Sequence, residues 1–336
     1  MTHRQLFLNS MAQTSDTPLM LEIEKAEGIY LYGKNGKKYI DLISGISVSN
    51  IGHRNPKVVE AIKDQLDKYM HLMVYGEYIQ SPQVLLAKRL KATLPVRLNN
   101  VYFVNSGAEA TEGALKLAKR YTGRAEIISC KNAYHGSTNG ALSVMGDEYF
   151  KQAFRPLLPG IRHIQFNDVK ELNEITEDTA AVIIETIQGE AGIRIPAEAY
   201  LKALRKKCTE TGTLLIMDEI QTGFGRTGKF WAFEHFGIEP DILLTSKGMG
   251  GGMPIGAFIA PKEIMNVLAN NPVLGHITTF GGHPVCCAAS LATIDVILDE
   301  KLMDGITEKE LLFHSLLKHP AIKEIRSKGL LLAVEF

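Results

Sequence analysis

A lysine followed by a glycine-rich turn is the first feature of the sequence that suggests covalent chemistry. Residues 241–244 read as an apolar strand, and Lys247 comes soon after it, before a run of glycines that ends at residue 252. A lysine amine that is partly shielded from water can attack a carbonyl carbon and form an imine, and glycines leave room for a flat ring beside it. The alternative is a solvated lysine in a flexible loop, so Lys247 needs support from other residues.

Two other strand ends carry groups that suit such chemistry. Residues 214–217 are an apolar run followed by Asp218, and ligands of open α/β sheets bind at the carboxyl ends of strands. A carboxylate there can pair with a protonated ring nitrogen. After the apolar residues 102–104, Gly107 and Ala108 begin a predicted helix, whose free N–H groups can hold a phosphate. Taken alone, each has a simpler explanation: a helix cap or loop carboxylate for Asp218, and a plain strand-to-helix turn for Gly107.

The elements that must position these residues alternate between helix and strand. Such alternation is typical of βαβ units and predicts a mainly parallel sheet, whose central strands are apolar because both of their faces are buried. The predicted segments are helices at about 56–69, 81–93 and 107–120, and strands at 101–104, 126–130, 180–184, 214–217, 241–244 and 255–259.

The two ends of the chain differ from this middle part. We expect an N-terminal arm with part of a small domain over 1–54, a large domain over 55–285, and the start of a C-terminal small domain over 286–336. The terminal elements predicted are strands at 28–32 and 38–42 joined by an Asn-Gly turn within 34–37, helices at 284–299 and 306–318, and strands at 322–325 and 330–336. Because a strand needs partners, an end inside a predicted strand suggests a truncated domain.

The composition indicates a globular protein that acts on small molecules. A length of 336 residues predicts about two domains, and 45% hydrophobic residues exclude a largely disordered chain. Lys plus Arg equals Asp plus Glu, at 37 each, so the basic excess of nucleic-acid-binding proteins and polybasic membrane surfaces is absent. The four cysteines lack the spacing of a disulfide framework, and no apolar run in the sequence reaches the length of a membrane span. We therefore expect a cytoplasmic protein with no nucleic-acid or membrane partner.

One motif suggests a different function, nucleotide hydrolysis. Residues 223–229 match the first seven positions of a phosphate-binding P-loop, but position eight is Phe230 and not Ser or Thr. The hydroxyl that would bind magnesium is therefore missing, and the segment does not come directly off a strand. We reject the nucleotide-hydrolase interpretation.

The combination of motifs resembles a known family. Residues 218–226, Asp241 and residues 246–250 (Ser-Lys-Gly-Met-Gly) resemble the signature of the class III aminotransferases, a fold type I family that depends on pyridoxal phosphate (PLP). Further blocks extend the resemblance over nearly the whole chain, at residues 39–42, 52–56, 105–110, 133–136, 187–192 and 278–282. The resemblance implies an α/β fold with a mainly parallel seven-stranded sheet, helices on both faces, and a smaller α+β domain built from both termini. It also implies a homodimer with the active site at the subunit interface.

The resemblance also implies roles for single residues. Lys247 would hold PLP as a Schiff base and serve as general acid and base, Asp218 would pair with the ring nitrogen, and Gln221 would lie near the phenolic oxygen. Tyr134 would stack on the ring, with His135 beside it also in contact with the cofactor. The other implied contacts are to the phosphate, from Gly107, Ala108, Ser106 and the neighbouring subunit's copy of Thr279, and to the substrate, from Thr278 and Glu190. A core position for Tyr134 and a plain surface acid at Glu190 are the alternatives.

The implied reaction moves an amino group from an amine or ω-amino acid to an oxo acid such as 2-oxoglutarate. Ser137 stands where relatives that act on acetylornithine, ornithine or 4-aminobutyrate tend to carry a carboxylate-binding arginine, which weakens the case for those substrates. The sequence stops at Phe336, before the region in which the family has another such arginine, so we expect PLP binding with weak or no transaminase activity. An aminomutase of the glutamate-semialdehyde kind and a non-catalytic PLP-binding relative are the alternatives.

Overall fold

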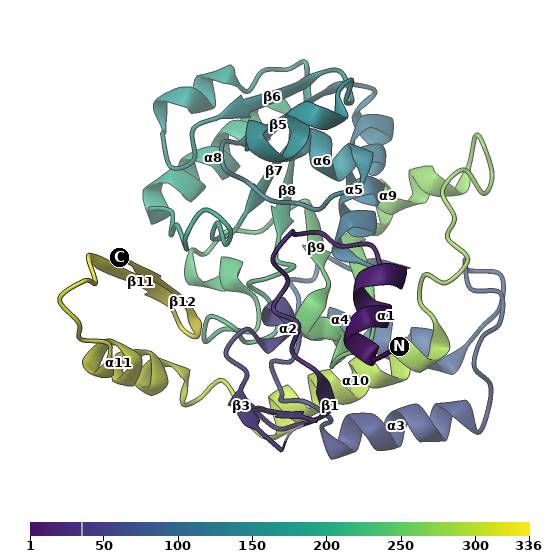
Figure 1. Ribbon diagram of the computed structural model, residues 1–336. Coiled ribbons are helices and arrows are strands. Elements are labelled where there is room, and N and C mark those ends of the chain that lie inside the picture. The colour runs from purple at the N-terminus through teal and green to yellow at the C-terminus, as the bar shows by residue number, and fades with distance from the viewer. Residues whose placement is uncertain (35) are drawn as a thin grey trace.

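The centre of the molecule is a seven-stranded sheet (Figure 1). The computed structural model describes residues 1–34 and 36–336. The strand order is β4-β10-β9-β8-β7-β5-β6; the five strands from β9 to β6 pair in parallel, and β10 is antiparallel to both β9 and β4. The strands are β4 (Asn100–Val104), β5 (Glu126–Cys130), β6 (Ile161–Ile164), β7 (Thr179–Glu185), β8 (Leu214–Asp218), β9 (Ile242–Thr245) and β10 (Gly256–Ala260). The predicted mainly parallel seven-stranded sheet is confirmed.

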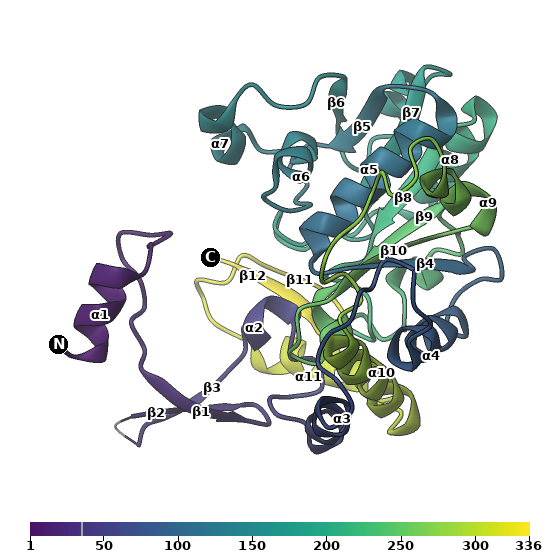
Figure 2. The same cartoon turned by 90° about the vertical axis from the view of Figure 1, so that its right-hand side faces the viewer.

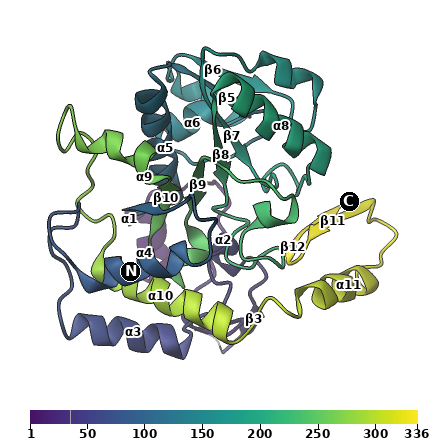
Figure 3. The same cartoon turned by 180° about the vertical axis from the view of Figure 1, so that it is seen from behind.

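Helices cover both faces of this sheet. Neighbouring side chains of a strand point to opposite faces, and on β7 the side chains of Val182 and Ile184 pack into one hydrophobic cluster while those of Ala181 and Ile183 pack into another. Figures 1 and 3 show α8 and α5 on opposite sides of the sheet. The first cluster includes residues of α4 (Ser81–Lys91), α8 (Glu198–Thr211) and α10 (Pro284–Asp299), and the second includes residues of α5 (Gly107–Thr122), α6 (Asn139–Val144) and α9 (Lys262–Met265).

The N-terminal part forms a separate small sheet. Its antiparallel strands are β1 (Ile23–Glu27), β2 (Tyr30–Gly33) and β3 (Lys38–Ile40). The last two correspond to the predicted strands, whereas β1 was not predicted; the predicted turn between them includes Asn35, which lies outside the described residues. Figure 2 shows α1 (His3–Ser10) standing apart from the body of the molecule. The remaining N-terminal helices are α2 (Ser44–Ser47) and α3 (Pro56–Leu66).

The C-terminal part packs beside the carboxyl ends of the strands. Helix α11 (Ile306–Leu316) leads to an antiparallel hairpin of β11 (Glu324–Lys328) and β12 (Leu331–Glu335). The strand predicted at 322–325 begins two residues later, because the backbone N–H of Ile322 donates to the carbonyl of His319 in a turn. The Arg326 Nε donates to the carbonyl of Gly192 at 2.7 Å, which ties the hairpin to the segment after β7.

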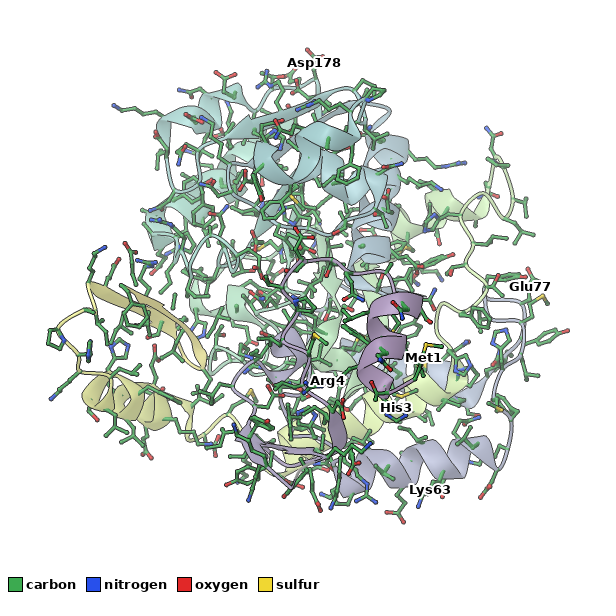
Figure 4. The ribbon with its side chains drawn as sticks, viewed as in Figure 1. Met1, His3, Arg4, Lys63, Glu77 and Asp178 are labelled. Atoms are coloured by element: carbon green, nitrogen blue, oxygen red, sulfur yellow. The ribbon has the colours of Figure 1, made fainter. Side chains whose placement is uncertain are left out.

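Charged side chains mark the outer surface. Lys63, Glu77 and Asp178 are exposed and point away from the body at its edges in Figure 4, as the hydration of charged groups requires. Inside, all four cysteines are buried and free. Among the described residues, no helix combines the length and apolar character that crossing a membrane requires.

Candidate active site

A cavity of about 440 Å³ opens at the carboxyl ends of β7, β8 and β9, which is where open α/β sheets bind their ligands. Most of the residues that the sequence singles out meet there. The predicted site residues that line the cavity are Gly107, Ala108, Tyr134, His135, Glu190, Asp218, Gln221 and Lys247.

Lys247 enters the cavity from a constrained turn. It follows β9, is half-buried, and begins a short 3-10 helix (Lys247–Gly250) with a φ of 46°. A positive φ is uncommon for a residue with a side chain and persists only where the surroundings hold it. The Ser246 hydroxyl donates to the carbonyl of Ile255 at 2.6 Å and fixes the turn against the start of β10. The lysine is therefore placed by buried backbone and not by a flexible loop.

Asp218 ends β8 and faces a buried histidine. Its side chain lies 2.7 Å from His135, with Oδ2 accepting from Nδ1, while Oδ1 accepts the backbone N–H of Ile220 at 2.9 Å. Both side chains are almost fully buried. The other ring nitrogen of His135, Nε2, is buried and has no hydrogen-bond partner among the described residues. Since buried polar atoms are normally paired, Nε2 indicates contact with a ligand group.

The N-terminus of α5 forms the opposite end of the site. Ser106 caps the helix, with its hydroxyl accepting the backbone N–H of Glu109 at 3.2 Å, and it does not line the cavity. Gly107 and Ala108 follow with the free N–H groups of the first turn, where an anion is stabilised by the helix dipole. A Cβ at Gly107 would lie 2.8 Å from the Ile220 side chain. A larger residue at position 107 would therefore displace the Ile220 side chain from the start of α5.

The mouth of the cavity carries an aromatic ring and a second carboxylate. Tyr134 is 38% exposed, which excludes the alternative of a core tyrosine, and its hydroxyl lies 3.3 Å from the Ser137 hydroxyl. Glu190 is exposed and accepts a hydrogen bond from the Gln221 Nε2 at 3.3 Å. Gly189 packs so tightly on Gln221 that an added Cβ would collide with its Oε1.

Thr278 and Thr279, like Ser106, do not line the active-site cavity of the single chain. Thr278 is half-buried beside another cavity, where its hydroxyl accepts from the Asn105 Nδ2 at 2.9 Å. Thr279 is exposed and does not line the active-site cavity. The P-loop-like residues 223–229 lie in turns after β8 and contribute nothing to the cavity lining.

The same cavity contains a buried acid, Glu185, that was not among the predicted site residues. It ends β7 directly beside Asp218 in the sheet register. Burial raises the pKa of Glu185 to about 7; the negative charge of Asp218 adds to this, whereas His135 and two backbone N–H groups oppose it. The signal was available, because an acid ends the apolar run at 180–184 just as Asp218 ends the run at 214–217.

Comparison with known proteins places this geometry in a family. The sequence model described as aminotransferase class-III matches residues 11–336. The acetylornithine aminotransferase of Methanopyrus kandleri is 42% identical over 312 residues, which cover 92% of this chain and 79% of that protein.

Solved structures agree. The taurine:2-oxoglutarate aminotransferase from Bifidobacterium kashiwanohense, crystallised in complex with PLP and glutamate, has a TM-score of 0.91 at 30% identity, covering 98% of this chain and 81% of that chain. The ornithine aminotransferase from Toxoplasma gondii has a TM-score of 0.89 at 34% identity, covering 98% of this chain and 80% of that chain. The chain belongs to the class III aminotransferases and is an amino-group-transferring enzyme.

Proposed function

We propose that this enzyme uses PLP to move an amino group from an amine or ω-amino acid to an oxo acid such as 2-oxoglutarate. The observation that carries the proposal is the meeting of Lys247, the buried Asp218 and the N-terminus of α5 at one cavity. Relatives with this fold include an acetylornithine, an ornithine and a taurine:2-oxoglutarate aminotransferase, and the last was crystallised with PLP.

The residues present fit this cofactor. PLP is a flat pyridine ring with a nitrogen that can be protonated, and it carries a phosphate group. The free N–H groups of Gly107 and Ala108 suit the phosphate, and the Asp218 carboxylate suits the ring nitrogen. The unpaired Nε2 of His135 offers a further polar contact. Tyr134, at the mouth, offers a face for the ring.

Each side chain then has a defined task. Bound PLP supplies an electron sink for the bond that breaks at the carbon bearing the amino group. Lys247 holds the cofactor through Nζ and, once released, carries a proton to or from that carbon at the same atom. Asp218 keeps the ring nitrogen protonated, and His135 fixes the carboxylate in place through the bond of 2.7 Å. Gln221 provides a polar contact to the phenolic oxygen.

Substrate selection involves the mouth of the cavity. Glu190, held by Gln221, contacts the substrate side of the site, and Ser137 replaces a fixed guanidinium with a small hydroxyl next to Tyr134. We propose that Thr279 completes the phosphate site of the neighbouring copy in a homodimer, with Thr278 facing the substrate. The exposure of Thr279 in the single chain supports this assignment.

A screen of amine donors tests the proposal. The chain is loaded with PLP, donors are added one at a time without an oxo acid, and the visible absorbance of the bound cofactor is followed. Bleaching by a donor and recovery on adding 2-oxoglutarate are expected, and rapid full turnover would refute the prediction of weak or no transaminase activity. Lys247→Ala should abolish the cycle, whereas the matched control Lys229→Ala, at an exposed lysine of the P-loop-like segment, should retain it. Failure of every donor to bleach the cofactor would exclude the aminotransferase assignment of this site.

A further inference from the structure

Glu185 lies between two segments that both line the active-site cavity. It is 7% exposed, at the end of β7. On one side is the segment after β5, residues 131–138, which carries Tyr134; on the other is the segment after β7, residues 186–190, which carries Glu190. The carboxylate of Glu185 contacts the backbone of both.

Its two oxygens hold one segment each. Oε2 accepts the backbone N–H of Tyr134 at 3.2 Å, and Oε1 accepts the backbone N–H of Gly189 at 3.0 Å. Both positions therefore need an acceptor. A carboxylate provides two, whereas a glutamine provides one and would turn its NH₂ group toward a backbone N–H. Because two donors would then face each other in a buried place, one of the two hydrogen bonds would be lost.

A further hydrogen bond joins the same two segments. The Gln188 Nε2 donates to the carbonyl of Lys131 at 2.9 Å. Gly189 packs directly on Gln221, whose Nε2 donates to Glu190. The position of Glu190 at the mouth thus depends on the path of the backbone at Gly189, whose N–H is held by Glu185.

We propose that Glu185 is a positioning residue of the aminotransferase site: its carboxylate ties the Tyr134 segment to the Glu190 segment, and so holds the ring-facing aromatic and the substrate-facing acid in a fixed relation. Its consequence for PLP and substrate rests on the function proposed above. The link between the two segments does not rest on that function, because both hydrogen bonds are made within the protein.

Hydrogen exchange of the full chain tests the tie itself. Without added PLP and at about pH 8.5, where Glu185 with its pKa of about 7 is ionised, the backbone amides of residues 131–138 and 186–190 should exchange about tenfold faster in Glu185→Gln than in the unaltered chain, as expected for one lost bond to a buried carboxylate. The strands β8 and β9 should be unaffected. Glu185→Asp, which keeps two acceptor oxygens on a shorter side chain, should fall between the two. The exposed Glu177→Gln is the matched control for loss of one negative charge and should change nothing.

Binding and kinetics test what the tie does for the site. In Glu185→Gln, the dissociation constant of PLP and the KM of the amine donor should each rise about tenfold, with kcat changed less than either. Unchanged exchange in both segments overturns the proposal, as does faster exchange throughout the molecule, which would show general destabilisation. A fall in kcat alone, with KM and PLP affinity intact, also overturns it. If the unaltered chain does not bind PLP, the proposed function fails, and the exchange comparison still decides whether Glu185 joins the segments.

Discussion

At the scale of single residues, the site combines buried charge with backbone conformations that residues other than glycine rarely adopt. Asp218 and Glu185 are neighbouring carboxylates at the ends of two paired strands, and His135 lies close enough to moderate their repulsion. Gly136 follows His135 with a φ of 124°, a conformation that side chains rarely allow. The charged groups are therefore aligned by a backbone path that tolerates little change.

Gly136→Ala should weaken the phosphate end of the site. The added Cβ would lie 2.7 Å from the Ala108 Cβ, so it would displace the first turn of α5 besides straining the backbone. We expect the unfolding free energy to fall by about 1–3 kcal/mol and PLP affinity to fall with it, as measured by denaturant unfolding and PLP titration.

Gly123→Ala separates the effect of backbone strain from the effect of a steric clash. Gly123 also has a positive φ, of 69°, but an added Cβ would meet nothing within 4 Å. This control should lose stability through backbone strain alone and keep its PLP affinity. Equal losses of affinity in the two variants would contradict the role given to the contact between Gly136 and Ala108.

At the scale of elements, sequence patterns predicted best where burial dictates residue type. The strands β7 and β8 are buried along their whole length, so continuous apolar runs identified them. The edge strand β6 and the small-sheet strand β1 are partly exposed, so they lacked such runs and were missed.

Position at the end of a buried strand or the start of a helix also decided which site residues could be predicted. Lys247, Asp218 and Gly107 stand directly at the ends of predicted elements, and the topology alone brings them to one edge of the sheet. The position of Glu185 at a strand end was visible in the sequence, but its role was not, because that role depends on backbone N–H groups of the distant Tyr134 and the nearby Gly189. No sequence motif encodes those contacts. The exposure of Thr279 likewise depends on how the chain folds around it.

Glu219 links three elements and should make stability depend on pH. Fully buried after β8, it accepts the backbone N–H groups of Ala232 and Phe233 at 2.7 Å each and the Thr186 hydroxyl at 2.8 Å. Burial raises the pKa of Glu219 from 4.5 to about 7. Between these values the folded protein binds more protons at this group than the unfolded chain, so the contribution of Glu219 to the unfolding free energy falls as the pH rises.

Denaturant unfolding of the unaltered chain and of Glu219→Gln between pH 4.5 and pH 8 measures this contribution. The difference in unfolding free energy should fall by on the order of 3 kcal/mol up to about pH 7 and stay level above it. Glu177→Gln, at an exposed position, should track the unaltered chain at every pH. A difference that stays level between about pH 5.5 and pH 7 would mean that Glu219 is ionised in the folded protein over that range.

At the scale of the whole molecule, all three proposed parts of the chain meet near the cavity. From the N-terminal part, the Asn50 Nδ2 donates to the carbonyl of Phe224 at 2.9 Å, and an added Cβ at Gly248, next to Lys247, would lie 3.0 Å from the same Nδ2 atom. From the C-terminal part, Leu331 packs with Ile187 and Ile193 on either side of the segment that carries Glu190. We propose that residues 55–285 form a large domain, that residues 1–54 and 286–336 contribute to a small domain, and that the two domains share one active site.

Reductive trapping followed by peptide mass mapping tests the proposal that Lys247 holds PLP covalently. The chain is incubated with PLP, treated with borohydride and digested, and the position of the added pyridoxyl mass is read by tandem mass spectrometry. Modification confined to Lys247, retained in Lys229→Ala and lost in Lys247→Ala, is the predicted result. Modification spread over surface lysines, with Lys247 unmodified, would contradict the account.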